Sequence, residues 1–252
     1  MTDTVLFSRL GHVGTLTLNN PERHNSLGQD ELGALMHHLD EIEGDEQLRV
    51  LVVTGAGDKT FCAGASLREL NAGQISGEAF QAVTDRLAHL DIPTIAALNG
   101  NIFGGGVELA LSCDFRIGVE GTRMRVPAAE IGLCYPLSGI NRFVQRLGVN
   151  AAKRILVAAE EFDADGMLVL GFLDHLVLPS QLADRTEAMA QQMSSLAPLA
   201  VRAMKRILQQ AADGAIDEAA AAALARQCQD SEDLQEGFAA AREKRDARFK
   251  GR

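Results

Sequence analysis

Two short glycine-bearing turns, residues 62–65 (CAGA) and 104–106 (GGG), carry the clearest chemical signal in this sequence. Glycine lets a backbone approach a ligand closely because it has no Cβ, so N–H groups from two such turns can converge on one oxygen. The second turn opens a helical run, and a helix N-terminus adds unpaired N–H groups and the positive end of a dipole. The turns are therefore candidates for stabilising a developing negative charge. A tight turn and a phosphate cradle are the alternatives.

Glu108 is the candidate acid–base group beside these turns. It lies three residues after Gly105, on the same side of the first helical turn. Its apolar neighbours Val107 and Leu109 disfavour a solvated surface role. A carboxylate in this position would face whatever the glycines hold, and it could transfer a proton there. The spacing fits neither a P-loop, which needs Gly-Lys-Ser/Thr, nor a GxGxxG nucleotide-binding turn.

The elements that must position these residues alternate between strand and helix. Residues 50–53 (VLVV) and 95–98 (IAAL) are continuous apolar runs, typical of strands covered on both faces. Residues 80–90 and 107–112 have the pattern of helices that follow such strands. The alternation predicts parallel strand pairing with right-handed crossovers in an α/β core.

The C-terminal part of the chain has a different pattern. From about Leu137 onward the sequence predicts helices, and residues 215–229 are rich in alanine with few bulky side chains. Such a helix buries little apolar surface alone, which favours close packing against another helix or subunit. We expect a catalytic core over residues 1–190 and a helical oligomerisation region over residues 191–252.

Composition narrows the classes of function. The formal net charge of the 252 residues is −10, which disfavours nucleic-acid binding because that depends on neutralising phosphates. No apolar stretch approaches the 18 residues of a membrane span. The four cysteines have no metal-ligand spacing with the six histidines. We therefore expect a cytoplasmic protein without a metal site and without nucleic-acid or membrane partners.

Several segments together resemble one family. Residues 61–70 (FCAGASLREL) and 99–117 (NGNIFGGGVELALSCDFRI) look like the crotonase superfamily, the enoyl-CoA hydratases and isomerases. Residues 20–27 (NPERHNSL) resemble its N-terminal signature, and residues 231–250 resemble its C-terminal end. The resemblance spans nearly the whole chain. It implies a spiral of ββα units, a helical C-terminal trimerisation region and an acyl-CoA substrate.

The resemblance also implies roles for particular residues. The backbone N–H groups of Ala65 and Gly105 would form an oxyanion hole for the thioester carbonyl. The positions that it assigns to coenzyme A binding are Arg23, Ala63, Arg68 and Lys250. A solvated surface charge is the alternative reading of each basic residue. No separate cofactor is expected, because the thioester itself accepts the electrons.

The second acid–base group is harder to assign. Hydratases of this family hold water between two glutamates, and Glu108 matches the first of them. Glu130 is the candidate for the second, because it precedes an Ile-Gly-Leu segment as the family's glutamate precedes an apolar-Gly-apolar one. Two more residues than usual separate it from Asp114, however, and Ser66 stands where aspartate is common. A wall or surface position for Glu130 is the alternative.

These observations predict an enoyl-CoA hydratase, a lyase that adds water across the 2,3 double bond of a 2-enoyl-CoA. Two alternatives remain open. One is another reaction at the same site, namely double-bond isomerisation, decarboxylation or thioester hydrolysis. The other is an acyl-CoA-binding protein without turnover. We expect a homotrimer or a hexamer built as a dimer of trimers.

Overall fold

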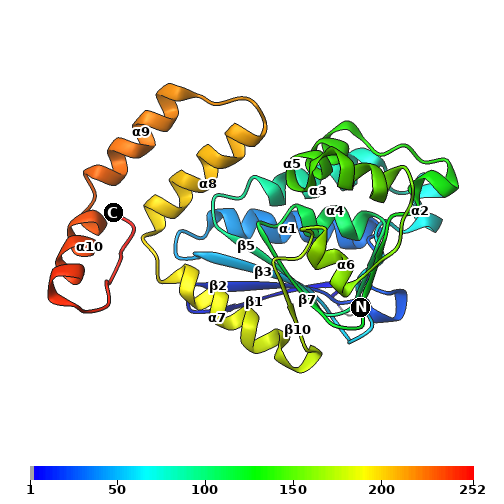
Figure 1. Cartoon of the computed structure of the whole chain (residues 1–252), viewed down its shortest axis with the longest axis horizontal. Helices are drawn as coiled ribbons and strands as arrows, with labels where there is room; N and C mark the ends of the chain where they lie inside the picture. Colours follow the sequence, from blue (N-terminus) through cyan, green and yellow to red (C-terminus); the bar gives the residue numbers. More distant parts are fainter. Residues whose placement is uncertain (1–2) are drawn as a thin grey trace.

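The computed structural model describes residues 3–252, in which the strands form a large and a small sheet (Figure 1). The strands are β1 (Val5–Leu10), β2 (Val13–Leu18), β3 (Val50–Gly55), β4 (Thr60–Cys62), β5 (Thr94–Leu98), β6 (Asn101–Phe103), β7 (Phe115–Val119), β8 (Arg123–Arg125), β9 (Phe162–Asp163) and β10 (His175–Val177). The helices are α1 (Gln29–Gly44), α2 (Leu67–Asn71), α3 (Gly77–Ala88), α4 (Gly105–Leu111), α5 (Leu137–Leu156), α6 (Ala164–Val169), α7 (Leu182–Ser194), α8 (Pro198–Ala212), α9 (Glu218–Gln229) and α10 (Glu232–Glu243). Short 3-10 helices are η1 (Pro21–Arg23), η2 (Ala128–Ile131) and η3 (Pro179–Gln181).

The large sheet has the order β1-β2-β3-β5-β7-β10, parallel except for the β1–β2 hairpin. Alternate residues of a strand face opposite sides of a sheet, and β3 follows this rule. Leu51 and Val53 enter the main core, whereas Val50 and Val52 enter a second core. Helix α7 covers that second face, packing against β2, β3, β5 and β7. Burial on both faces explains the continuous apolar run of β3.

The small sheet has the order β4-β6-β8-β9, and its first three strands are parallel. The pairs β3–β4, β5–β6 and β7–β8 each give one strand to the large sheet and the next to the small one. Helices follow each pair, which confirms the predicted spiral of ββα units. Because β4, β6 and β8 are parallel neighbours, the turns that leave their carboxyl ends lie at one edge.

The region after Leu137 departs from the purely helical expectation. Strands β9 and β10 interrupt the helices, and β10 pairs with β7 at the edge of the large sheet. Two- and three-residue strands are too short to show the alternation that identifies a strand in a sequence. The boundary expected at residue 190 falls inside α7, which lies on the large sheet and ends at Ser194.

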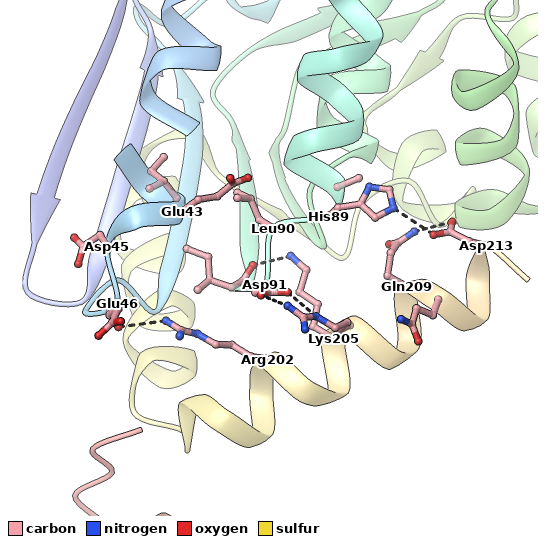
Figure 2. Close-up of a pocket in the computed structure, with 15 residues that line it drawn as sticks. Glu43, Asp45, Glu46, His89, Leu90, Asp91, Arg202, Lys205, Gln209 and Asp213 are labelled. Atoms are coloured by element: carbon pink, nitrogen blue, oxygen red, sulfur yellow. Dashed lines mark hydrogen bonds and ion pairs between the residues drawn. The ribbon is translucent and has the colours of Figure 1, made fainter. Parts of the chain in front are cut away.

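Helices α8, α9 and α10 extend from one side of the α/β body (Figure 1). A cavity of about 620 Å³ lies between α8 and this body (Figure 2). From α8, the Lys205 Nζ lies 2.6 Å from a carboxylate oxygen of Asp114 and donates to the Ile92 carbonyl oxygen, also at 2.6 Å. Arg206 forms an exposed ion pair with Asp91. Contacts of charged side chains therefore hold α8 against the α/β body. No helix of residues 3–252 is both long and apolar enough to cross a bilayer.

Candidate active site

The two glycine-bearing turns meet at the edge of the small sheet. The parallel pairing of β4 with β6 brings residues 63–65 and 104–105 together as they leave the two strands. A one-residue bridge fixes the first turn: Leu27 N donates to Gly64 O at 2.8 Å, and Ser66 N donates to Leu27 O at 2.9 Å. Ala65 lies between Gly64 and Ser66, and its N–H takes no part in these hydrogen bonds.

Close backbone packing explains why glycine occupies both turns. A Cβ on Gly64 would lie 2.5 Å from the backbone nitrogen of Gly105, and the φ of Gly64 is +83°. A Cβ on Gly105 would lie 2.7 Å from the ring of Phe80 and 3.4 Å from the nitrogen of Ala65. Within residues 3–252, the N–H groups of Ala65 and Gly105 donate to no other residue. Two neighbouring unpaired donors are suited to bind one carbonyl oxygen.

Glu108 is buried on α4, one helical turn after Gly105, with 1% of its surface exposed. Its Oε1 accepts hydrogen bonds from Arg142 Nη1 at 2.8 Å and from Thr84 Oγ1 at 3.3 Å. Gly139 makes room for the carboxylate, because a Cβ there would lie 3.0 Å from both carboxylate oxygens. Burial raises the pKa of Glu108 above its usual range, although the charge of Arg142 and the Thr84 hydrogen bond oppose that rise.

The two oxygens of Glu108 differ in their surroundings. Both hydrogen bonds end on Oε1, and Oε2 accepts none from residues 3–252. In this part of the chain, the buried side-chain atoms that lack a partner are Thr186 Oγ1 and Arg202 Nε. Oε2 is not among them, so it retains contact with open space. It is the oxygen available to a substrate.

Comparison with known proteins decides the family. Residues 9–252 match the family model described as enoyl-CoA hydratase/isomerase. The chain belongs to the enoyl-CoA hydratase/isomerase family. A short-chain-enoyl-CoA hydratase of Clostridium acetobutylicum is 33% identical over 250 residues, which are 96% of each chain. A crotonyl-CoA hydratase of Syntrophomonas wolfei is 30% identical over 254 residues, 98% of each chain.

Solved structures agree with this assignment. An enoyl-CoA hydratase/carnithine racemase from Magnetospirillum magneticum superposes with a TM-score of 0.93 at 28% identity, covering 100% of this chain and 97% of that one. An enoyl-CoA hydratase from Bacillus anthracis gives 0.90 at 28% identity, covering 99% and 100%. The predicted crotonase-type α/β fold is confirmed. The chain is an enzyme of the enoyl-CoA hydratase/isomerase family.

The structure does not bring Glu130 to Glu108. Glu130 lies on η2 with its side chain about half exposed, and it forms an ion pair with Arg125. Val126, directly after β8, and Ala128, at the start of η2, are the buried residues that join the core here. The carboxylate of Glu130 therefore contacts Arg125, while that of Glu108 contacts Arg142, and a shared catalytic role of the two stays a prediction.

The four residues predicted to bind coenzyme A separate into two groups. Ala63 belongs to the first turn, and its N–H donates to the carbonyl of His24 at 3.0 Å. Arg23 precedes His24 on η1, and Arg68 lies on α2 directly after the turn; both are exposed. The backbone segments that carry these three residues therefore lie at or next to the first turn.

Lys250 lies elsewhere in the same chain. The preceding residue, Phe249, accepts a hydrogen bond through its carbonyl oxygen from Arg49, which comes just before β3. The turns of the site leave the carboxyl ends of the strands. At about 3.3 Å per residue, the six residues of β3 separate these two ends by roughly 17 Å. The residue before Lys250 therefore lies at the opposite end of β3, and a role of Lys250 in coenzyme A binding stays a prediction.

A groove of about 630 Å³ opens beside Ala63. Its wall includes the side chains of His24, Lys59 and Arg123. The same wall includes the carboxylates of Asp58 and Glu120, so it holds charges of both signs. Among residues 3–252, no cluster of three or more His, Cys, Asp or Glu side chains is arranged to hold a metal ion.

Sequence reasoning missed several residues that contact the site. Phe80 and Thr84 come from one face of α3, and Arg142 comes from the buried face of α5. Tyr135 packs edge-to-face against Phe143, with 5.8 Å between ring centroids. Burial raises the pKa of the Tyr135 phenol, and the negative charge of Glu108 adds to that effect. A buried Thr and a buried Arg on otherwise apolar helix faces were the available signals.

Proposed function

We propose that this enzyme moves a proton at the α carbon of an enoyl-CoA thioester. Ala65 and Gly105 would donate their N–H groups to the thioester oxygen and stabilise the enolate that forms. Oε2 of Glu108 would remove and return the proton. The observation that carries the proposal is the alignment of two free backbone donors with one buried carboxylate oxygen on the next helical turn.

The reaction that fits a single carboxylate best is isomerisation of a 3-enoyl-CoA to a 2-enoyl-CoA. Glu108 would take the proton from C2, and the resulting dienolate would regain a proton from the same carboxyl group at C4. Both transfers use one oxygen, and no atom is added or lost. Glu130 supports no second transfer, because it is paired with Arg125 at the surface.

Hydration of a 2-enoyl-CoA is the second candidate, favoured by the chain's similarity to the two bacterial hydratases described above. With one carboxylate, Glu108 would have to deprotonate the water and then protonate C2. Both candidates use the same oxyanion hole and need no further cofactor, because the thioester carbonyl takes up the charge.

Two substrates offered in parallel separate these reactions. A conjugated 2-enoyl thioester absorbs in the ultraviolet, so isomerisation of a 3-enoyl-CoA increases absorbance and hydration of a 2-enoyl-CoA decreases it. We expect an increase with a 3-enoyl-CoA. A decrease with a 2-enoyl-CoA alone would establish hydration instead. Tight coenzyme A binding without turnover of either substrate, over several chain lengths, would indicate a binding protein.

Substitution of the two glutamates tests how many carboxylates take part. Glu108→Gln should lower kcat by about 10²-fold or more, because general acid–base catalysis contributes roughly 10²–10⁴-fold. Glu130→Gln should change kcat by no more than about twofold, as expected for a surface position. Comparable large losses in both variants, measured by steady-state kinetics, would contradict the one-carboxylate proposal.

Coenzyme A itself would lie along the turns that carry Arg23, Ala63 and Arg68. The groove beside Ala63 supports this, since Lys59 and Arg123 in its wall could pair with the anionic phosphates of coenzyme A. We also propose self-association into a trimer or a dimer of trimers through the C-terminal helices. Exposed Leu208 and Phe238, on α8 and α10, support that assembly. A cytoplasmic location remains the expectation from the sequence.

A further inference from the structure

We propose that Arg142 is a positioning residue: by holding Oε1 of Glu108, it presents Oε2 to the α carbon of the substrate. This inference rests on the proposed role of Glu108. Arg142 lies 34 residues after Glu108 in the sequence, on a different helix. Arg142 need not touch the substrate in order to act.

The geometry limits the carboxylate from three sides. Arg142 Nη1 donates to Oε1 from α5, and Thr84 Oγ1 donates to the same oxygen from α3. Gly139, one turn before Arg142 on α5, lies directly against the carboxylate. Rotation of the carboxylate would break both hydrogen bonds, so the arrangement fixes which oxygen faces the open space.

Arg142 is itself held in place. Its Nη2 donates to Oδ1 of Asp85, the residue after Thr84 on α3. Arg142 is 6% exposed, whereas the side chain of Asp85 is 42% exposed. A guanidinium can make both contacts because its donors lie in one rigid plane. The three charges form a chain from the surface at Asp85 through Arg142 to Glu108.

The charges along this chain have opposite effects on Glu108. The charged and titratable groups that face it are Arg142, Asp85 and Tyr135, with the hydroxyl of Thr84 beside them. Burial raises the pKa of Glu108, Arg142 lowers it and Asp85 raises it. Glu108 acts as a base only when ionised, so activity should fall as the pH drops through its pKa. Removing Arg142 should move this acid limb to higher pH, and removing the Asp85 charge should move it to lower pH.

The test measures kcat against pH for Arg142→Gln and Asp85→Asn in the full-length enzyme. Loss of Arg142 should raise the midpoint of the acid limb by roughly 1–3 pH units, the usual size of an Arg–carboxylate effect. Asp85→Asn should lower the midpoint. Arg142→Lys should restore much of the wild-type midpoint, because it keeps the positive charge.

Arg154→Gln is the matched control, because Arg154 lies on the same helix but forms an exposed ion pair with Glu160. Its acid limb should remain in place. A purely structural role for Arg142 predicts lower activity at every pH with an unchanged midpoint, and that outcome would overturn the proposal.

A titration without substrate separates this inference from the proposed function. Carbon-13 spectra of glutamate-labelled protein report the ionisation of Glu108 directly, with Glu108→Gln identifying its signal. Absence of enoyl-CoA turnover would remove the proposed function, while the titration would still test Arg142. Turnover in which neither variant changes the titration of Glu108 would overturn the inference alone.

Discussion

Ala65 and Gly105 offer backbone N–H groups rather than side chains to the site, so their role depends on conformation and not on residue type. Gly64 sets that conformation. Its left-handed φ and its contact with the Gly105 nitrogen leave no room for a Cβ. The neighbouring glycine thus matters as much to the proposed oxyanion hole as the two donors themselves.

Gly64→Ala should therefore damage catalysis more than stability. The new Cβ must push the two turns apart, and loss of one oxyanion donor costs roughly 10²–10³ in kcat. Gly11→Ala is a suitable control, because Gly11 also has a positive φ but has nothing within 4 Å of its would-be Cβ. Both variants carry the strain of a positive φ, and Gly64→Ala adds a backbone clash, so it should also lose more thermal stability than Gly11→Ala. Equal kcat losses would contradict a role for the Gly64 turn in the hole.

The sequence predicted the residues of the site that are set locally. Ala65, Gly105 and Glu108 follow strand ends at short, recognisable spacings. Arg142 could not be found this way, because its contact with Glu108 depends on how α5 packs against α4. Glu130 was identified from its place before an Ile-Gly-Leu segment. That sequence pattern alone could not tell whether its side chain faces the core or Arg125.

At the scale of elements, α8 connects the protruding helices to the body through buried charge. Lys205 is 11% exposed on its side chain, and Asp114, its partner, also accepts from the N–H and the hydroxyl of Thr94. Lys205 also lines the cavity in Figure 2. The position of α8 therefore depends on a few polar contacts rather than on a large apolar face.

Lys205→Met should destabilise the fold by about 1.5–3 kcal/mol, the usual contribution of a hydrogen bond to a charged group. The loss would come from the unpaired Asp114 carboxylate and the Ile92 carbonyl. Chemical unfolding monitored by circular dichroism measures this. Arg206→Gln on the same helix should cost less than about 1 kcal/mol, because its ion pair with Asp91 is exposed. The reverse order of the two losses would refute this account.

The elements were predictable where their patterns were long. Apolar runs marked β3 and β5, and the helical spacing marked α3 and α4. Strands β9 and β10 escaped detection because pairing with β8 and β7, and not their own residues, defines them. The alternation of strands and helices indicated parallel pairing, and the resemblance to the family indicated a spiral of ββα units. The division of each strand pair between two sheets was not predicted.

At the scale of the whole molecule, the C-terminal helices expose large apolar side chains. Leu208 on α8 and Phe238 on α10 are 69% and 65% exposed. Such side chains are available to an interface between subunits. The chain-wide resemblance predicted a trimerisation region here, and this assembly stays a prediction.

Phe238→Asp should weaken the assembly, because a charge would be buried at the expected interface. Light scattering after size-exclusion chromatography should give a trimer or hexamer for the wild type and smaller species for the variant. Val169→Asp, on α6 in the α/β body, is the control for an exposed apolar residue outside these helices. A wild-type mass equal to one 27.0 kDa chain would rule out the proposed assembly.

Tyr135 makes the site accessible to fluorescence measurements. It is the only tyrosine of a chain without tryptophan, so the tyrosine fluorescence of this protein arises from a single phenol packed beside Glu108. Quenching or enhancement on addition of an acyl-CoA would report events in the site without any label. The enzyme thus carries its own optical probe, and rapid-mixing experiments can follow ligand entry separately from turnover.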